Sequence, residues 1–166
     1  MSLLLTPSHW PRWALMWALA ASLYAACKWL TWRGAVVDGV PRWKQVAYLL
    51  AWPGMDAVTF LTKRSYSRPA AAEWASGAAR LALGLACFFG LARYTPADQQ
   101  YIAGWIGMVG LVLMLHFGAF HVLSCAWRRF GVDAHPLMNR PLHAVSLSDF
   151  WGRRWNTAFR DRKSVV

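Results

Sequence analysis

The sequence predicts an all-α, polytopic integral membrane protein with three to four transmembrane helices. Hydrophobic residues make up 57% of the 166 positions, above the roughly 45–50% of ordinary globular chains. Long apolar segments recur along the chain, and its 12 Trp suit the interfaces of a bilayer. We expect a single membrane domain over residues 1–166, with an interfacial or re-entrant segment and a cytoplasmic amphipathic helix in addition to the spans.

Three segments are expected to cross the membrane, because about 20 residues of helix cover its ~30 Å hydrocarbon core. The first runs from Trp10 to Trp32, with Trp at both ends and with Lys28 close enough to one end to reach the headgroups. The second runs from Trp74 to Tyr94, and Arg80 near its start is expected to reach the headgroups in the same way. The third, Tyr101 to Leu123, contains no Asp, Glu, Lys or Arg.

A fourth apolar segment, from Trp43 to Leu61, is interrupted. Its apolar run from Val46 to Trp52 is short, and Pro53, Gly54 and Asp56 follow it. Because unsatisfied backbone in lipid is costly, the interruption favours an interfacial or re-entrant hairpin over a plain span. Asp56 itself is interpreted as a turn-stabilising residue, as the N-cap of a short helix, or as a functional carboxylate.

The distribution of basic residues predicts the orientation, since cytoplasmic loops are enriched in Lys and Arg. With three spans, the loop after the first span and the C-terminal tail share one side, and the opposite side keeps only Arg12 and Arg93. A fourth span would move Arg33, Arg42 and Lys44 to that opposite side and weaken the asymmetry. Both arrangements place the tail in the cytoplasm, and we prefer three spans. The net charge of +11 is thereby explained by a membrane and not by nucleic acid.

The cysteines and the intramembrane histidines indicate neither a metal nor a cofactor. Cys27, Cys87 and Cys125 are far apart in or beside apolar runs and are expected to be free thiols. His116 and His121, five residues apart, would point some 140° apart on a regular helix, so the two do not share one metal. Each is interpreted as an interhelical hydrogen-bond donor or as a functional residue. The sequence also shows no phosphate-binding glycine loop, no nucleophile elbow and no cleavable signal peptide.

The stretch "SLSDFWGRRWNTAF", residues 146–159, is too polar for a span and too aromatic for an ordinary solvated helix. Ser146 or Ser148 can cap a helix here. A regular helix would align one polar face and one aromatic ridge, and would pair Asp149 with Arg153. The polar face would hold Asp149, Arg153, Asn156 and Arg160, and the ridge Trp151, Trp155 and Phe159. Two interpretations remain: a helix lying in the headgroups, or a polar face presented to an anionic substrate.

Residues 146–161, "SLSDFWGRRWNTAFRD", resemble the hallmark of the wax synthase-like branch of the membrane-bound O-acyltransferases. "GVDAHPLMNRPLHAVSL", residues 131–147, resembles the approach to that hallmark, so the motif segment spans 131–161. "LLAWPGMDA", residues 49–57, is similar to an upstream motif of bacterial members. The resemblance covers most of the chain after residue 45.

The resemblance implies transfer of a fatty acyl group from acyl-CoA, as co-substrate and without a cofactor, to a hydroxyl such as that of a long-chain alcohol. It implies Asn156 as the catalytic residue of the motif. A His base on a later apolar helix belongs to the same pattern. Residues expected to bind substrate are Asp149, Trp151, Arg153, Arg154, Trp155 and Arg160, with the arginines and Lys163 available for the phosphates of CoA.

No His follows Asn156, so we expect the chain to correspond to the N-terminal portion of such an enzyme, completed by further C-terminal helices or an oligomer. The expected location is a bacterial inner membrane, with membrane lipids as partners and the tail in the cytoplasm. The alternative is a non-catalytic membrane protein whose basic, aromatic tail binds anionic lipid or a partner protein.

Overall fold

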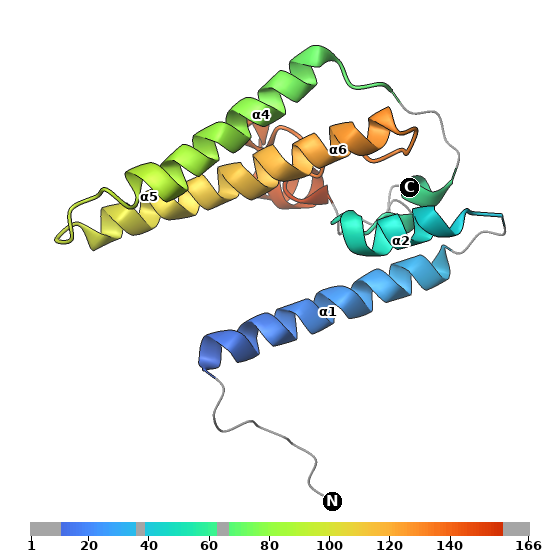
Figure 1. The fold of residues 1–166 in the computed structure, drawn as a ribbon, viewed down its shortest axis with the longest axis horizontal. Coiled ribbons are helices and arrows are strands. Elements are labelled where there is room, and N and C mark those ends of the chain that lie inside the picture. Colours follow the sequence, from blue (N-terminus) through green and yellow to red (C-terminus); the bar gives the residue numbers. More distant parts are fainter. Residues whose placement is uncertain (1–10, 36–38, 63–66, 158–166) are drawn as a thin grey trace, which may run out of the picture.

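The computed structural model describes residues 11–35, 39–62 and 67–157, which form helices and connecting segments without a strand (Figure 1). Three helices are long and apolar enough to cross a membrane, with 23, 21 and 30 residues. They are Arg12–Gly34, Ala71–Leu91 and Gln100–Arg129. The all-helical class and the three predicted spans are therefore confirmed. Leu19, Trp17 and many other apolar side chains on these helices are exposed, as expected of surfaces that face lipid.

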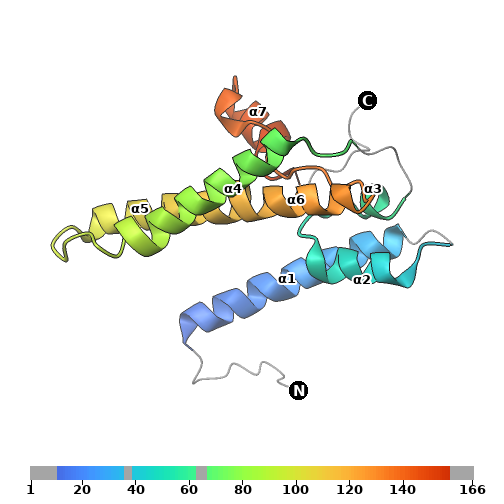
Figure 2. The same cartoon turned by 45° about the horizontal axis from the view of Figure 1, so that its top comes forward.

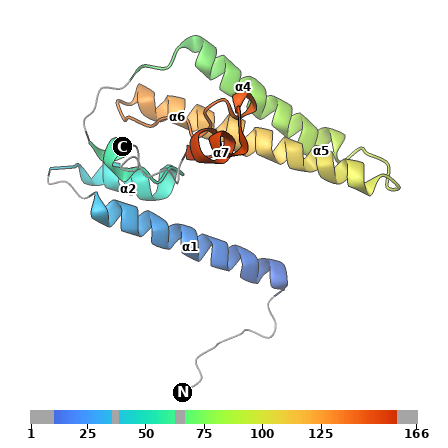
Figure 3. The same ribbon diagram turned by 180° about the vertical axis from the view of Figure 1, so that it is seen from behind.

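The second and third spans form an antiparallel hairpin (Figures 1 and 3). The second consists of α4 (Ala71–Leu85) and the π-helical η1 (Ala86–Leu91). The third consists of α5 (Gln100–Val112), the π-helical η2 (Leu113–Ala119) and α6 (Phe120–Arg129). Glycines allow the two backbones to touch: a Cβ placed on Gly84 would lie 2.7 Å from Met114 Cα, and one on Gly110 would lie 2.8 Å from Phe88 N. Small residues at the contact are the usual means of close helix packing in membranes.

The first span, α1 (Arg12–Gly34), lies beside α2 (Arg42–Ala51) in all three views of the fold (Figures 1–3). After α2 the helix breaks at Pro53 and Gly54 and resumes as the short α3 (Ala57–Leu61), as the sequence predicts for an interrupted hairpin. Asp56 caps α3, since its carboxylate accepts hydrogen bonds from Thr59 N at 2.9 Å and from Thr59 Oγ1 at 2.7 Å. Of the three interpretations of Asp56, the N-cap is thus the one observed.

Lys28 corrects one sequence-based expectation, because it does not extend toward the headgroups. Its side chain is buried, and Nζ donates to the carbonyl oxygen of Trp52 at 2.7 Å and to that of Gly54. Nζ also lies 3.5 Å from the centre of the Tyr48 ring. Burial raises the pKa of Tyr48 to about 12, so the phenol stays neutral. The ammonium reaches inward because the helix break leaves carbonyl groups without helical donors.

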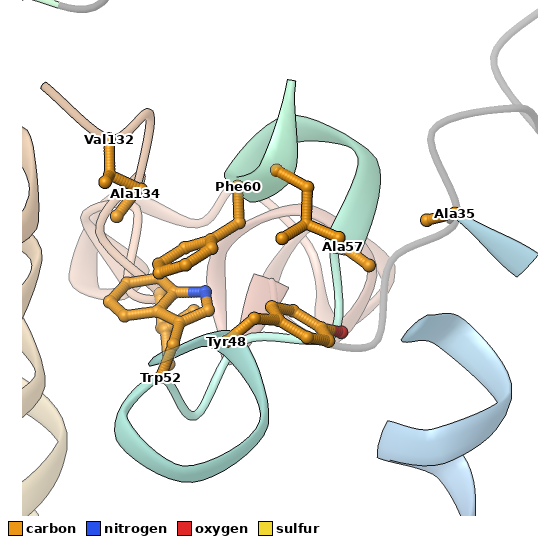
Figure 4. Packing of buried hydrophobic residues seen from close by; sticks show 9 residues of the cluster. Ala35, Tyr48, Trp52, Ala57, Phe60, Val132 and Ala134 are labelled. Carbon is orange, nitrogen blue, oxygen red and sulfur yellow. The ribbon is translucent and has the colours of Figure 1, made fainter. Parts of the chain in front are cut away.

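A compact aromatic core forms around the helix break (Figure 4). Phe60 lies at its centre, stacked on Trp52 with ring centroids 5.9 Å apart and 5.4 Å from Trp127 of α6. Trp127 Nε1 also donates to the carbonyl oxygen of Ala51 at 3.1 Å. The buried members of the core are Ala35, Tyr48, Trp52, Ala57, Phe60, Leu61, Val132, Ala134 and Leu137. This core connects the first half of the chain to the end of the third span.

Beyond α6 the chain turns back along the hairpin. Gly131, with φ +82°, ends the span in a conformation that suits glycine. The buried Ser124 hydroxyl then donates to the carbonyl oxygen of Ala134 at 2.7 Å, which holds the returning chain against α6. The short elements η3 (Pro141–His143), α7 (Leu147–Asp149) and η4 (Phe150–Arg154) follow. Figure 2 shows α7 on the opposite side of the hairpin from α1.

Candidate active site

The motif segment begins as predicted and then departs from a regular helix. Ser146 is the N-cap, and its Oγ accepts from Asp149 N at 3.0 Å. From Phe150 the turn is π-helical, with Trp155 N donating to Phe150 O at 2.8 Å. A π turn brings residues five apart together, so Asp149 pairs with Arg154 at 2.6 Å. The predicted Asp149–Arg153 pair is therefore wrong, because it assumed the spacing of an α-helix.

The Asp149–Arg154 pair organises the start of the motif segment. The carboxylate also accepts from Val145 N at 3.2 Å, and Arg154 donates to the carbonyl oxygen of Arg140 at 3.3 Å. The Arg154 guanidinium holds the pKa of Asp149 below its usual value. Asp149 and Arg154 are thus both bound within the protein. Arg153, the other basic residue of this turn, is exposed to solvent.

Asn156 lies beyond the end of the helical turn and not on a helical face. Trp155 is extended, and Asn156 has φ +44°, in the left-handed region that Asn tolerates better than most residues. The backbone on both sides is fixed to residues 137–139, since Asn139 N donates to Arg154 O at 2.9 Å and Thr157 N to Leu137 O at 2.8 Å. The predicted polar face of a single helix is therefore wrong. Its last member, Arg160, lies outside the described residues, as do Phe159 and Lys163.

Trp155 anchors the motif segment to the third span. Its ring stacks on Phe150 at 5.4 Å and on His116 of η2 at 5.8 Å, with interplanar angles of 19° and 25°. Phe117 meets the same indole edge-on at 6.2 Å. Trp151, the other tryptophan of the predicted ridge, touches Trp155 at 6.1 Å but is 61% exposed. Of the two tryptophans of the predicted ridge, Trp155 therefore packs against the third span, whereas Trp151 remains on the surface.

A groove of about 1000 Å³ lies between the hairpin and the returning chain. One wall is formed by α4 and the third span, which contribute Val109, Val112 and Leu113 together with the two histidines, His116 and His121. The opposite wall is formed by residues 136–143 with Phe150 and Trp155. Most of its lining is apolar, so the groove suits an aliphatic chain with few polar contacts.

A second, smaller hollow of about 530 Å³ shares residues 136–139 with the groove, since these residues border both spaces. It brings together the two regions of the chain that carry the resemblance. Asp56 and Trp52 come from the helix break, and Arg153 and Thr157 come from the motif segment. One short segment thus borders both the mainly apolar groove and a smaller hollow that is more polar than the groove.

A cluster of Glu73, His121 and Cys125 was not anticipated from the sequence. One ligand atom from each lies within 4.8 Å of the others, and the four-residue spacing of His121 and Cys125 on a helix was the overlooked signal. Arg128, however, places its guanidinium 2.6 Å from Glu73 Oε2 and 3.4 Å from Cys125 Sγ. Because this cation already neutralises the carboxylate, we assign no metal to the cluster. The three cysteines are free thiols, as predicted.

Comparison with known proteins gives one short likeness. Over 31 residues, 19% of this chain and 9% of the relative, the sequence is 55% identical to a long-chain-alcohol O-fatty-acyltransferase of Simmondsia chinensis. The chain is similar to part of an acyltransferase. No family model matches the chain, and no solved structure matches it. The matched stretch is a small part of that enzyme's length, so activity and substrates are taken up below as proposals.

Proposed function

We propose that the chain acts as a membrane-bound O-acyltransferase of the wax synthase type, moving a fatty acyl group from acyl-CoA to a long-chain alcohol. The proposal rests on the position of the motif segment, which borders both the mainly apolar groove and the smaller hollow lined by Asp56, Asp133 and Arg153. Both substrates have that division of character, an aliphatic chain with a polar reacting end. The likeness to a long-chain-alcohol O-fatty-acyltransferase supports the same substrate class.

The smaller hollow is the proposed place for the CoA end of the donor. Arg153 is exposed and lines the hollow, so its guanidinium is available to phosphate oxygens, which Arg binds with two parallel hydrogen bonds. Arg154 is tied to Asp149 and is proposed to shape the turn. On this proposal the hollow faces the cytoplasm of a bacterial inner membrane, where acyl-CoA is available.

Asn156 is the proposed polar group at the reacting carbonyl. Its left-handed backbone is held from both sides, because Arg154 O accepts from Asn139 N and Thr157 N donates to Leu137 O, and this fixes the direction in which the amide side chain leaves the backbone. A fixed amide N–H stabilises the oxyanion that forms when an alcohol attacks a thioester, and removing such a donor typically lowers the rate roughly 10²–10³-fold. Trp155, next to it, keeps this segment against the groove.

Membranes containing the protein, supplied with labelled palmitoyl-CoA and hexadecanol, are expected to form the labelled wax ester. Asn156→Gly removes the amide but keeps a residue suited to φ +44°, so ester formation is expected to fall roughly 10²-fold with the fold intact. Val145→Ala is the control in the same part of the chain, because Val145 is 89% exposed and borders neither the groove nor the smaller hollow. No ester above background from the wild-type protein, or an equal rate for Asn156→Gly, overturns the proposal.

One observation favours a second candidate function. Trp151 is 61% exposed beside the exposed Arg153, which is the pairing of a Trp ring and a basic group found where proteins lie on anionic lipid. If lipid binding is the whole function, binding to phosphatidylserine vesicles falls steeply with salt and with Trp151→Ala, and Asn156→Gly leaves it unchanged. The ester assay and the vesicle assay therefore separate the two functions.

A further inference from the structure

The groove between the hairpin and the returning chain carries two kinds of lining. Val109, Val112 and Leu113 of the third span contribute apolar side chains to it. Ser76 and Arg80 contribute polar side chains from one face of α4, because residues four apart are neighbours on a helix surface. A ligand that matches both kinds of lining has an aliphatic part and a polar part.

The glycine contacts of the hairpin show that these two linings lie at different heights. A Cβ placed on Gly118 would lie 2.6 Å from the Cα of Leu81, so Arg80, the neighbour of Leu81, is level with residue 118 of the third span. Val109 lies nine residues before Gly118, about 13 Å further toward the turn of the hairpin. The groove therefore has an apolar end near that turn and a polar end nearer the start of α4 and the end of α6.

Arg80 is a charged residue well inside a membrane span. It is the tenth of the 21 residues of Ala71–Leu91, and about 13 Å of helix separates it from the first. Glu73 is the one acidic residue among the described residues that line the groove, and Arg128 already binds its carboxylate at 2.6 Å. An arginine at such a depth is costly unless it is paired, so Arg80 points to a ligand of opposite charge.

A second arginine, Arg140, borders the groove from the opposite wall. Its carbonyl oxygen accepts a hydrogen bond from Arg154 at 3.3 Å, which ties it to the motif segment. The next residue, Trp155, stacks on His116 of the third span, two positions before the residue that is level with Arg80. Arg140 is therefore held near the height of Arg80, on the other side of the groove.

The polar end has binding capacity that the described residues do not use. Neither Arg80 nor Arg140 takes part in an ion pair with another described residue. His121 borders the groove close to Arg80, and its Nε2 is buried without a hydrogen-bond partner in the described part of the chain. Buried polar atoms of native proteins are normally partnered, so this nitrogen also indicates a missing ligand.

We propose that the groove binds one anionic phospholipid, with its phosphate between Arg80 and Arg140 and its acyl chains in the apolar end. A phosphate presents oxygens in several directions and can bind two arginines from opposite walls, whereas one guanidinium is enough for a carboxylate. The head lies toward the end of the hairpin where α4 begins and α6 ends, as in a lipid of the leaflet on that side. Basic pockets between membrane helices are known to bind such headgroups.

This lipid site is distinct from both proposed functions. It needs no acyl transfer, and it does not involve the surface of Trp151 and Arg153, since Arg153 lines the smaller hollow and neither residue borders the groove. A protein that forms no ester is therefore still expected to bind the lipid. A protein that forms ester but binds no lipid refutes this site alone.

Native mass spectrometry of the protein in mild detergent, titrated with phosphatidylglycerol, tests the site. One tightly bound lipid per chain is expected. Arg80→Gln and Arg140→Gln each remove a hydrogen bond to a charged group, so each is expected to weaken binding at least about tenfold. Arg93→Gln is the matched control, because Arg93 is exposed and borders neither space. Wild-type affinity in Arg80→Gln, or two bound lipids of which each arginine holds one, overturns the proposal.

The part played by the groove is tested with both arginines left in place. Val112→Trp fills the apolar end and is expected to weaken the binding of phosphatidylglycerol. Leu111→Trp is its control, because Leu111 is exposed and does not line the groove. Glycerol phosphate, which has no acyl chains, is expected not to compete. Equal binding by the two variants, effective competition by glycerol phosphate, or tighter binding of palmitate than of phosphatidylglycerol overturns the proposed occupant.

Thermal midpoints distinguish a lost contact from a damaged fold. Phosphatidylglycerol is expected to raise the midpoint of the wild type, because a ligand that binds the folded protein stabilises it. Arg80→Gln is expected to match the wild type without lipid and to rise less when lipid is added. If its midpoint falls without lipid and rises with lipid as much as that of the wild type, Arg80 supports the fold and its role in binding is refuted.

Discussion

The first span and the hairpin of the second and third spans are held in place by different kinds of contact. In the hairpin, glycines bring two apolar backbones together along their length, at Gly84 and Gly110 among others. The first span is fixed near one end, by the ammonium of Lys28 on the carbonyl groups of the helix break. Most of the rest of α1 is exposed.

This difference separates two tasks in one small membrane protein. The hairpin forms a rigid wall, and it is this wall that carries His116 and the groove. The Lys28 contact fixes the shape of an irregular segment, and that segment carries Trp52 and Asp56 to the smaller hollow. Close apolar packing therefore builds the wall, whereas a buried cation stabilises backbone that cannot satisfy itself within a helix.

Substituting Gly84 by Leu is expected to give the largest effect. A Cβ there meets the backbone of Met114, and backbone atoms cannot rotate aside, so the cost should exceed the roughly 1–3 kcal/mol typical of overpacking. The hairpin would separate, and the thermal midpoint in mild detergent should fall by many degrees. Gly90→Leu is the matched control, because no atom lies within 4 Å of a Cβ at Gly90. Equal melting of the two variants would contradict packing through glycine.

Lys28→Met is expected to have the next largest effect, confined to the other region. The substitution leaves the carbonyl oxygens of Trp52 and Gly54 without their donor, at about 1–3 kcal/mol for a buried group. Chymotrypsin should cleave faster after Tyr48 and Phe60, the buried aromatic residues on either side of the break, while cleavage within residues 71–129 stays slow. Lys28→Arg keeps a cation and should restore part of the protection. If Lys28→Met accelerated cleavage within the hairpin as much as cleavage around the helix break, the stabilities of the two regions would not be independent.

The sequence predicts what depends on local composition. Span length and apolarity are enough to place three helices, and Pro53 with Gly54 is enough to place the break, because both act within a few residues. The prediction that Lys28 extends to the headgroups was wrong. It assumed that an ammonium near the end of a span has no closer hydrogen-bond acceptor, whereas buried carbonyl oxygens lie within its reach. Only the tertiary structure brings Trp52 and Gly54 to it.

The motif segment also shows that local sequence patterns predict single residues better than their arrangement in space. Ser146 was recognised as a possible N-cap from its own spacing. The polar face through Asn156 was wrong because periodicity arguments assume 3.6 residues per turn, and the π turn at 150–154 shifts every later residue. The stacking of His116 on Trp155 joins distant segments, and no single-sequence pattern reports such a contact. The residue types of the site were therefore predictable, while their arrangement was not.

Trp155→Leu should detach the motif segment from the hairpin at a smaller cost. Each aromatic pair contributes about 0.5–1.5 kcal/mol beyond its buried area, and Leu loses the stacking on both His116 and Phe150. The N–H groups of Asn139 and Thr157 join residues 137–139 to the motif segment. Amide exchange at these two residues should accelerate roughly tenfold. Trp155→Phe keeps a stacked ring and should exchange at nearly the wild-type rate. Unchanged exchange in Trp155→Leu would show that hydrogen bonds alone hold the segment.

The smallest expected effect is the pH dependence of the start of the motif segment. Because Arg154 holds the pKa of Asp149 below its usual value, the ion pair contributes stability above the unfolded pKa of about 4 and loses it as pH falls through the lower folded pKa. The protection factor of the Phe150 amide, which compares its exchange rate with that of an unstructured chain at the same pH, should therefore fall below about pH 4 in the wild type. Asp149→Asn should remove this step, since its amide has no charge to lose, and Ser146→Ala should keep it at a lower baseline because the cap is lost but the pair is not. An identical acid profile in Asp149→Asn would assign the step to another carboxylate, and the turn would then be held by its caps and rings and not by the ion pair.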